Sequence, residues 1–559
     1  MHRRTFVASA LASISLKYLC PPALAQASLT SSHLPQKLAD LHCHIFNADD
    51  LPIEGFVRKV IIPASTELRS QFRDYPDAFI ALIRVLSTVM KEAAPSPAEE
   101  IALAVPPTAT ERRNKDLATI EKLLNRIWSR EIPPGLDFKD GIAVNVAVTK
   151  LQKLLIDEVY PSFFCCGATQ DDVENVPLKD MAERLYVSNG IVGRNTRWAL
   201  LFTRYRFELA DALQSFHGGK AVLATPALVD FSKWLEDDNV SNLDQQVAVM
   251  GRLTRRKTGL RIHPFMAFDP LRQALHIKAG GAESDSPLAL VKKAIESEGF
   301  IGVKLYPPMG FRAFNNAGAG TDFPSHVRKP TALGKEPGKQ LDDALAQLFT
   351  WCAVNHVPVM AHAANSNGAG PGYGTRANPR YWLSLLKQPN FSNLRINLAH
   401  FGGFEEGGSP EKSWEWSIGK SWQQSPGAFL YADMSYFSEI LQSDAQKRKS
   451  LMAGWKALRE QFPQSANRLI YGSDWVMLGR EKGVAPIDLQ AHKPYSALVA
   501  DFLSSVGYSD DQIASIMWRN ASRFLGLGAE EKPLGTRARL EKFYSTEGIN
   551  ADWLTNYGV

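Results

Sequence analysis

The sequence predicts an α/β fold, a (β/α)8 TIM barrel with a long, mostly helical insertion between the first and second strands. Three observations predict it: eight short apolar runs, segments of helical period that alternate with them, and a long stretch between the first run and the second. Near-continuous apolar runs are typical of parallel strands that are buried on both faces. The eight runs cover residues 38–46, 221–231, 260–268, 300–307, 357–364, 395–402, 428–435 and 468–475.

The division of the chain follows from these runs. The barrel is expected to comprise residues 28–46 and 195–529, and residues 530–559 form a polar C-terminal tail. Residues 47–194 are far more than one helix needs, so we expect a helical insertion that caps the carboxyl ends of the strands, or alternatively an oligomerisation arm. Helical patterns cover residues 78–92, 109–130, 141–158 and 196–216, the last being the expected first helix of the barrel.

Composition narrows the class of protein. The 559 residues are 45% hydrophobic and 22% charged, which is ordinary globular usage. The 63 Lys and Arg residues against 58 Asp and Glu residues leave a formal charge of only +5. This small excess gives no reason to expect a nucleic-acid partner, and a homo-oligomer stays open.

The first residues have the features of an export signal. Arg3 and Arg4 precede an apolar stretch over residues 7–16, and small residues follow at Ala25 and Ala27. This pattern is typical of a twin-arginine signal peptide, here residues 1–27. Because the apolar stretch is shorter than the roughly 20 residues that span a bilayer, we expect cleavage and a periplasmic or secreted protein with no stable membrane anchor.

Five potential metal ligands follow the same positional rule. His42 and His44 lie on the first predicted strand, one residue apart, so alternation directs both to one face. His362, His400 and Asp474 stand near the carboxyl ends of later strands. Those ends converge in a barrel, so nitrogen and oxygen donors would meet in one pocket. Such a set suits Zn, or Mn, Fe, Co or Ni.

These residues lie in motifs that resemble the amidohydrolase superfamily. The similarity is to the amidohydrolase-related (amidohydrolase-2-like) group, which also contains decarboxylases and hydratases, and it runs from Leu38 to about Leu527 without the insertion. The motifs are Asp-x-His-x-His at 40–44, Ala-His at 361–362, Ala-His-Phe-Gly-Gly at 399–403, Tyr-Gly-Ser-Asp-Trp at 471–475 and the closing segment 516–526.

The resemblance implies roles for these side chains. It makes His42, His44, His362 and Asp474 metal ligands, with Asp474 also accepting a proton from a water molecule that the metal activates. It leaves His400 as a ligand of a second ion or as a group that polarises the substrate or moves a proton.

Lys304 bears on the number of ions. It lies in Gly-Val-Lys-Leu near the end of the fourth predicted strand. Superfamily members with two ions carry a carboxylated lysine there, whereas the amidohydrolase-related group often keeps it unmodified. One ion is favoured. Lys304 and Arg312 could instead hold a substrate carboxylate, and Tyr306 and Trp475 are further candidates for lining the pocket.

The function that follows is a metal-dependent hydrolase acting on an amide, ester or lactone of a small molecule. The alternative is a lyase, a decarboxylase or hydratase acting on a carboxylate substrate with the same metal. A third class, an exported binding protein on a degenerate barrel, would lack a ligand, and no ligand of the expected set is missing.

Overall fold

The computed structural model describes residues 31–61, 76–129, 148–149, 152–153, 155–160, 177–320, 322–325, 327, 329–404, 413–425, 427–528 and 534–555. The predicted signal peptide and parts of the predicted insertion lie outside these ranges. No helix among the described residues is long and apolar enough to cross a membrane.

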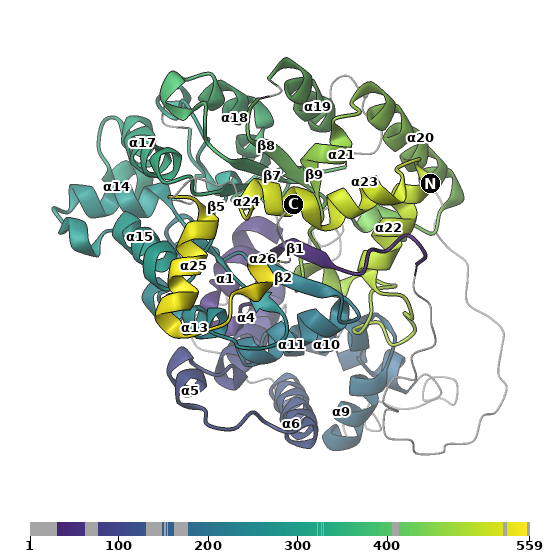
Figure 1. Ribbon diagram of the computed structural model, residues 1–559. Helices are drawn as coiled ribbons and strands as arrows, with labels where there is room; N and C mark the ends of the chain where they lie inside the picture. Colours follow the sequence, from purple (N-terminus) through teal and green to yellow (C-terminus); the bar gives the residue numbers. More distant parts are fainter. Residues whose placement is uncertain are drawn as a thin grey trace.

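Parallel strands form the centre of the molecule, with helices around them (Figure 1). Every described strand pairing is parallel. Each of the eight predicted runs contains a strand, so the α/β prediction is confirmed. The strands are β1 (Leu38–Cys43), β2 (Ala221–Pro226), β3 (Arg261–Ile262), β4 (Phe265–Ala267), β5 (Gly302–Leu305), β6 (Val359–Ala364), β7 (Ile396–Gly402), β8 (Leu430–Asp433) and β9 (Leu469–Ile470).

The strands fall into two sheets, ordered β1-β2-β3 and β4-β5-β6-β7-β8-β9. The division between β3 and β4 lies within the third predicted run, at Pro264, which has no backbone N–H to donate to a neighbouring strand. Backbone contacts link the sheets at both edges. Ala227 forms a bridge with Phe265, and the Leu41 N–H donates to the Tyr471 carbonyl at 3.1 Å.

Helices follow most of the strands and pack on their outer side. Alternate strand residues face these helices; Val303, Leu305, Ile396 and Leu398 all belong to the large apolar core beneath them. The principal helices are α11 (Arg206–Phe216), α13 (Leu243–Thr254), α14 (Pro270–Lys278), α15 (Pro287–Ser297), α17 (Pro337–Val354), α18 (Pro379–Leu386), α19 (Trp414–Gln424), α20 (Ala445–Gln461), α22 (Tyr495–Ser505), α23 (Asp510–Ala514) and α24 (Asn520–Leu525).

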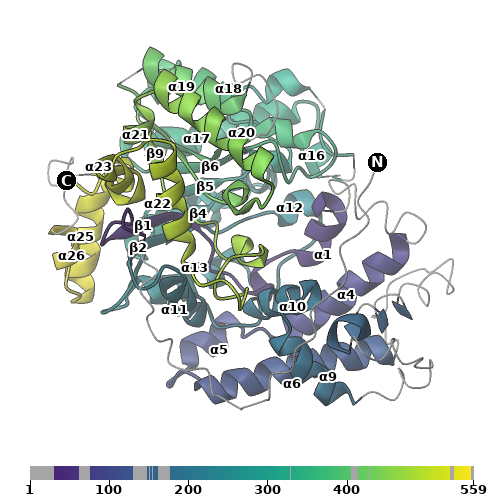
Figure 2. The same ribbon diagram turned by 90° about the vertical axis from the view of Figure 1, so that its right-hand side faces the viewer.

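The predicted insertion is helical over its described parts. Its helices α5, α6 and α9 lie together on one side of the molecule, away from the strands (Figures 1 and 2). The amphipathic faces of α6 and α9 meet in a separate core that includes Leu124 and Leu185, together with Ile156 from the chain between them. The helices are α1 (Ile53–Phe56), α4 (Pro76–Ala93), α5 (Pro97–Ala102), α6 (Ala109–Trp128), α9 (Leu178–Val187) and α10 (Ile191–Leu201).

The helix predicted over residues 196–216 is corrected by the structure, which has two helices there, α10 and α11. The break lies at residues 202–205. The Thr203 hydroxyl donates to the Leu200 carbonyl, and Arg204 pairs with buried Asp116 of α6. These tertiary contacts end the first helix although no Gly or Pro marks the position in the sequence.

A buried ion cluster joins the insertion to α11. Arg206 is fully buried and donates to both carboxylate oxygens of Asp50, at 2.7 and 2.9 Å, and to Glu100 at 3.1 Å. Removing one member of such a cluster would leave an uncompensated charge, which costs about 3–5 kcal/mol. The cluster therefore holds the start of the insertion against the helix that leads into β2.

The C-terminal residues are packed, which differs from the polar tail that the sequence predicts. Helix α25 (Thr536–Glu547) and α26 (Asp552–Thr555) lie against the amino ends of the strands. Leu540, Phe543 and Tyr544 join Phe265 and Ile301 in one apolar cluster. The Tyr544 hydroxyl also bonds to Nε2 of buried His263. Residues 534–555 thus close that end of the interior.

Candidate metal centre

Two histidines of the first strand, β1, point into the interior, and the register between β1 and β2 is irregular there. The pairing of β1 with β2 shifts between Asp40 and Cys43. Leu41 and His42 both contact interior residues, while Asp40 points outward to His217 at the end of α11, 2.9 Å away. A β-bulge re-aims side chains in this way. Strict alternation is therefore wrong for Asp40, although His42 and His44 do share the interior with ring centroids 5.4 Å apart.

Asp474 reaches the same point from the segment that follows β9, which lies next to β1. Its Oδ1 lies 3.1 Å from Nε2 of His44 and 3.9 Å from Nε2 of His42. The Asp474 backbone N–H donates to the His42 carbonyl at 2.7 Å, which joins the two segments. His42, His44 and Asp474 are one of the groups of donors close enough to hold an ion, and all three side chains are buried.

Hydrogen bonds set the tautomer of both histidines. Nδ1 of His44 faces the Ala227 carbonyl at 2.8 Å, so it carries the proton and leaves Nε2 with a lone pair. Nδ1 of His42 lies 2.7 Å from the Ser435 hydroxyl and 3.3 Å from Asp433. Nε2 of His42 accepts from the Lys304 ammonium at 2.8 Å. The Nε2 lone pair of His44 therefore faces Asp474, whereas the Nε2 lone pair of His42 accepts from Lys304.

Burial determines the protonation of the cluster. It lowers the pKa of His42 to about 3, with the Lys304 charge adding to the effect, and it lowers the pKa of Lys304 to about 8 against the pull of Asp433 and Asp474. Burial would raise the pKa of Asp474, but the close contact with His44 and the nearby imidazoles lower it to about 2. At neutral pH His42 is a neutral donor and Asp474 is a carboxylate.

His362 and His400 lie beside this group and pack edge to face. Their ring centroids are 4.5 Å apart, and the His400 ring is 4.9 Å from that of His42. Nδ1 of His400 faces the Ser435 carbonyl at 3.1 Å, whereas Nδ1 of His362 is buried with no hydrogen-bond partner among the described residues. Burial lowers the pKa of both imidazoles, so each is neutral at pH 7.

Two of these side chains require an unusual backbone. His400 has a φ of 66° and Asp474 a φ of 56°, in the left-handed region that L residues rarely adopt. Such conformations cost of order 1–3 kcal/mol and gather where function needs a particular side-chain direction. Here they turn two potential donors toward one interior space.

Asp433, at the end of β8, is the residue that sequence reasoning missed. Its carboxylate is fully buried and accepts from Asn397 at 2.6 Å, from the His400 backbone N–H at 3.0 Å and from the Ser435 N–H at 3.1 Å. Burial opposes its ionisation, but His42 and these donors hold its pKa far below the usual value. The rule that selected Asp474, an acid at the carboxyl end of a predicted strand, would have found it.

The remaining predicted residues are divided between the cluster and the core. Tyr306 packs on the His362 ring, with centroids 4.5 Å apart. Trp475 is fully buried against Phe216 of α11, which places it in the core under the helices. Arg312 lies over the Tyr381 ring instead of beside Lys304. Lys304 and Tyr306 thus join the histidines, whereas Trp475 and Arg312 do not.

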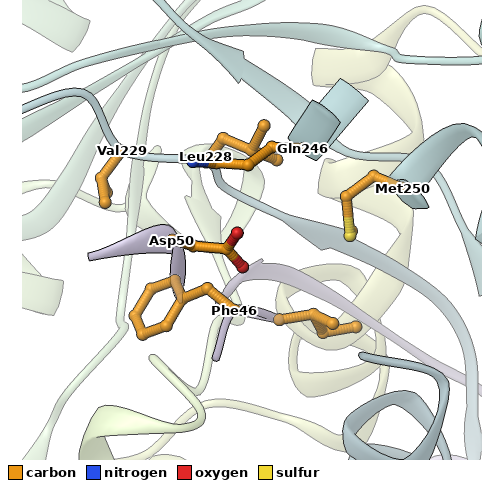
Figure 3. Close-up of a pocket in the computed structure, with 7 residues that line it drawn as sticks. Phe46, Asp50, Leu228, Val229, Gln246 and Met250 are labelled. Carbon is orange, nitrogen blue, oxygen red and sulfur yellow. The ribbon is translucent and has the colours of Figure 1, made fainter. Parts of the chain in front are cut away.

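Two hollows lie near the cluster. An internal cavity of about 10 Å³ sits beside the first residues of the insertion (Figure 3), with room for about one water molecule. An open groove of about 550 Å³ lies over the segments that follow β7, β8 and β9, at the carboxyl ends of the strands. Its lining comprises Gly403, Phe404, Ser438, Glu439, Leu441, Gln442, Ser443, Glu481 and Lys482.

Comparison with known proteins gives the family. Residues 278–527 match the model of the amidohydrolase family, and this range holds Lys304, His362, His400, Asp433 and Asp474. The match covers less than half of the 559 residues, and over that part the chain is similar to the amidohydrolase family. The family is one of metal-dependent hydrolases, which implies a divalent metal and agrees with the grouped His and Asp side chains. No protein with a curated description matches the sequence.

Similar solved structures are distant. A protein assigned as a metal-dependent hydrolase of Lactobacillus casei is 13% identical, with 88% of this chain and 95% of that chain covered and a TM-score of 0.36. One assigned as a 2-pyrone-4,6-dicarboxylic acid hydrolase of Pseudomonas putida is 14% identical over 57% and 87%, with a TM-score of 0.32. One assigned as an amidohydrolase of Staphylococcus aureus is 13% identical over 57% and 91%, with a TM-score of 0.33.

Proposed function

We propose that this protein uses one divalent ion, Zn in the first instance, to hydrolyse a C–N or C–O bond of a small molecule such as an amide, ester or lactone. The observation that carries the proposal is the convergence of three acceptors. Nε2 of His44 and Nε2 of His42 lie 3.1 and 3.9 Å from Oδ1 of the Asp474 carboxylate, and Nε2 of His42 also accepts from Lys304. Acceptors this close repel unless a cation lies between them, and bonds of about 2.0 Å in a tetrahedron place donors about 3.3 Å apart.

We infer that the framework is a closed (β/α)8 barrel. The eight strand positions, counting β3 and β4 as one interrupted strand, and the hydrogen bonds at both sheet edges support closure. In this fold the carboxyl ends of the strands carry the active site. His42, Lys304, His362 and Asp474 all occupy that end.

The donor set fits one ion better than two. His42, His44 and Asp474 would hold it, and His362 would join them because its buried Nδ1 has no partner among the described residues. The second possible group consists of His42, His400 and Asp433. In that group Nδ1 of His42 bears the proton and the Asp433 carboxylate already accepts several hydrogen bonds, so little donor capacity is left.

The residues around the ion would divide the chemistry. A bound divalent ion lowers the pKa of water toward 7 and polarises a substrate carbonyl. Asp474, ionised at neutral pH, is the group that accepts a proton. His400 keeps its Nε2 lone pair because Nδ1 donates to Ser435, so it serves as the second acceptor. Asp433 holds His42 and His400 in place and does not touch the substrate.

A lyase acting on a carboxylate substrate is the second candidate. It is favoured by the position of Lys304, a buried ammonium beside His42 in the same interior. Such a cation could hold a substrate carboxylate while carbon dioxide or water leaves. Carboxylation of Lys304 would instead give the binuclear form of the centre.

We further propose that the insertion covers the entrance to the site and that residues 1–27 direct export. The Trp198 indole of α10 donates to the Val476 carbonyl at 2.8 Å, two residues beyond Asp474. Asn189 donates to Asp488 at 2.8 Å in the same segment. These contacts bring the end of the insertion to the side of the strands on which the groove lies.

Elemental analysis of the purified chain tests the metal, with His42→Ala as the variant and His276→Ala, on the outer helix α14, as the matched control. We expect about one equivalent of transition metal in the wild type and the control, and a small fraction of that in His42→Ala, since a ligand is lost. Less than half an equivalent in the wild type would refute the proposal. Turnover in ¹⁸O-labelled water then separates the reactions, because hydrolysis places the label in the product and decarboxylation releases carbon dioxide.

A further inference from the structure

Two arginines lie beyond the metal centre in the segments that follow β5 and β6. Arg376 belongs to η7 (Tyr373–Ala377), and Arg312 follows η5 (Pro307–Met309). The two segments pack together, with the Ala369 N–H donating to the Pro308 carbonyl at 3.0 Å. Lys304 and His362 end the strands from which these segments start, so the arginines lie outward from the cluster at the carboxyl ends of the strands.

Both guanidinium groups retain donors without acceptors. Arg376 is only 4% exposed, and its Nη2 donates to the Asp322 carboxylate at 2.7 Å, but its Nη1 is buried with no partner among the described residues. Nε of Arg312 is likewise buried and unpartnered there, while its Nη1 makes a long contact of 3.4 Å with the Asn315 carbonyl. A buried N–H of a charged group that lacks an acceptor costs more than the 1–3 kcal/mol of a neutral one.

The charges around these donors do not balance. Burial lowers the pKa of Arg376, and the Arg312 charge lowers it further. Arg380 shares the Tyr381 ring with Arg312, at 4.7 and 5.0 Å. Against these cations, the carboxylate that pairs with Arg376 is that of Asp322, whose side chain is 67% exposed. The region therefore has an excess of positive charge.

We infer that Arg312 and Arg376 form a binding subsite for a carboxylate, separate from the metal and from Lys304. The planar fork of a guanidinium matches a carboxylate in two parallel hydrogen bonds, and it would use the donors that now lack acceptors. The inference deepens the proposed function, on which it rests: it assigns the hydrolase a substrate that carries an acidic group away from the bond that reacts. Tyr373 and Tyr381 border the subsite with aromatic rings.

Equilibrium binding of glutarate, measured by calorimetry on the metal-loaded chain, tests the subsite. The variants are Arg376→Gln, Arg312→Gln and Arg376→Lys, with Arg113→Gln on the exposed side of α6 as the matched control. We expect the dissociation constant to rise at least tenfold in both Gln variants, to rise less in Arg376→Lys, which keeps charge without the fork, and to stay unchanged in the control. Unchanged affinity in both Gln variants, or no binding by the wild type, would overturn the inference. If Arg376→Gln fails to fold, Arg376→Lys and Arg312→Gln decide.

The same titration on metal-free protein separates the sources of the carboxylate. If the affinity for glutarate falls when the metal is removed, the ligand is substrate-like and spans the subsite and the metal. If the affinity is unchanged, the subsite binds a free anion. Inorganic phosphate, the second probe, would then bind as well. Metal content distinguishes the two proposals. If the protein as purified holds less than half an equivalent of metal but binds glutarate through the arginines, the hydrolase alone is refuted. One equivalent of metal without such binding would refute the subsite alone.

Discussion

The two ends of the space between the strands are built from opposite kinds of residue. At the amino ends, Leu41, Phe265, Met360, Tyr431 and Ile470 form an apolar layer that α25 covers from outside. At the carboxyl ends, the same strands present imidazoles, carboxylates and one ammonium, nearly all buried. The ionisable side chains are His42, His44, Lys304, His362, His400, Asp433 and Asp474.

Because of this difference, neighbouring residues of one strand contribute separately to stability and to the metal centre. The apolar layer gains free energy on burial, whereas the carboxyl-end layer buries ionised carboxylates and holds His400 and Asp474 at positive φ, both of which cost stability. Leu41 and His42 are consecutive yet belong to different layers. Substitutions in the two layers should therefore change different measured quantities.

The largest effect on stability is expected from the apolar layer. Leu41→Ala removes a fully buried side chain and leaves a cavity, so the free energy of unfolding should fall by about 2–5 kcal/mol, measured by urea denaturation. Metal stoichiometry should stay at the wild-type value. The control is Leu489→Ala, at a leucine that is 52% exposed. Loss of metal from Leu41→Ala at unchanged stability would contradict the separation of the layers.

The opposite pattern is expected at Asp433, where a substitution should change metal binding more than stability. Asp433→Asn keeps the shape of the side chain but removes the charge that orients His42 through Nδ1, so the affinity for metal should fall by about 10–100-fold. Competition with a chelator measures it. Asp238→Asn, at a side chain that is 78% exposed, is the control and should match the wild type. Equal metal affinity in Asp433→Asn and the control would show that Asp433 has no positioning role.

The smallest effect concerns pH and the amino-end layer. Burial lowers the pKa of His263 to about 4, below the value of about 6.5 in the unfolded chain, so the unfolded state binds the proton first as the pH falls. Between pH 7.5 and pH 5 this group should remove about 2 kcal/mol of stability. Over the same pH range, the free energy of unfolding of His263→Gln should fall by about 2 kcal/mol less than that of the wild type. His276→Gln should behave as the wild type. Parallel losses in all three proteins would exclude His263 as the source.

Much of this arrangement could be predicted from local pattern. Apolar runs of strand length mark β1 to β9 because parallel strands are buried on both faces, and histidines at the ends of those runs indicate the cluster. The bulge at Asp40 could not be predicted, since it depends on Asp40 pairing with His217 and with the Ser473 N–H, contacts between distant parts of the chain. The break between α10 and α11 and the packing of α25 escaped prediction for the same reason.

The position of α25 has a practical consequence for work with this protein. The family match ends at residue 527, which invites a shortened chain that stops there. Such a chain would lose Leu540, Phe543 and Tyr544 and leave the underside of the strands open to water, with Phe265 and Ile301 uncovered. Recombinant versions meant for metal analysis or crystallisation should therefore retain the sequence through residue 555.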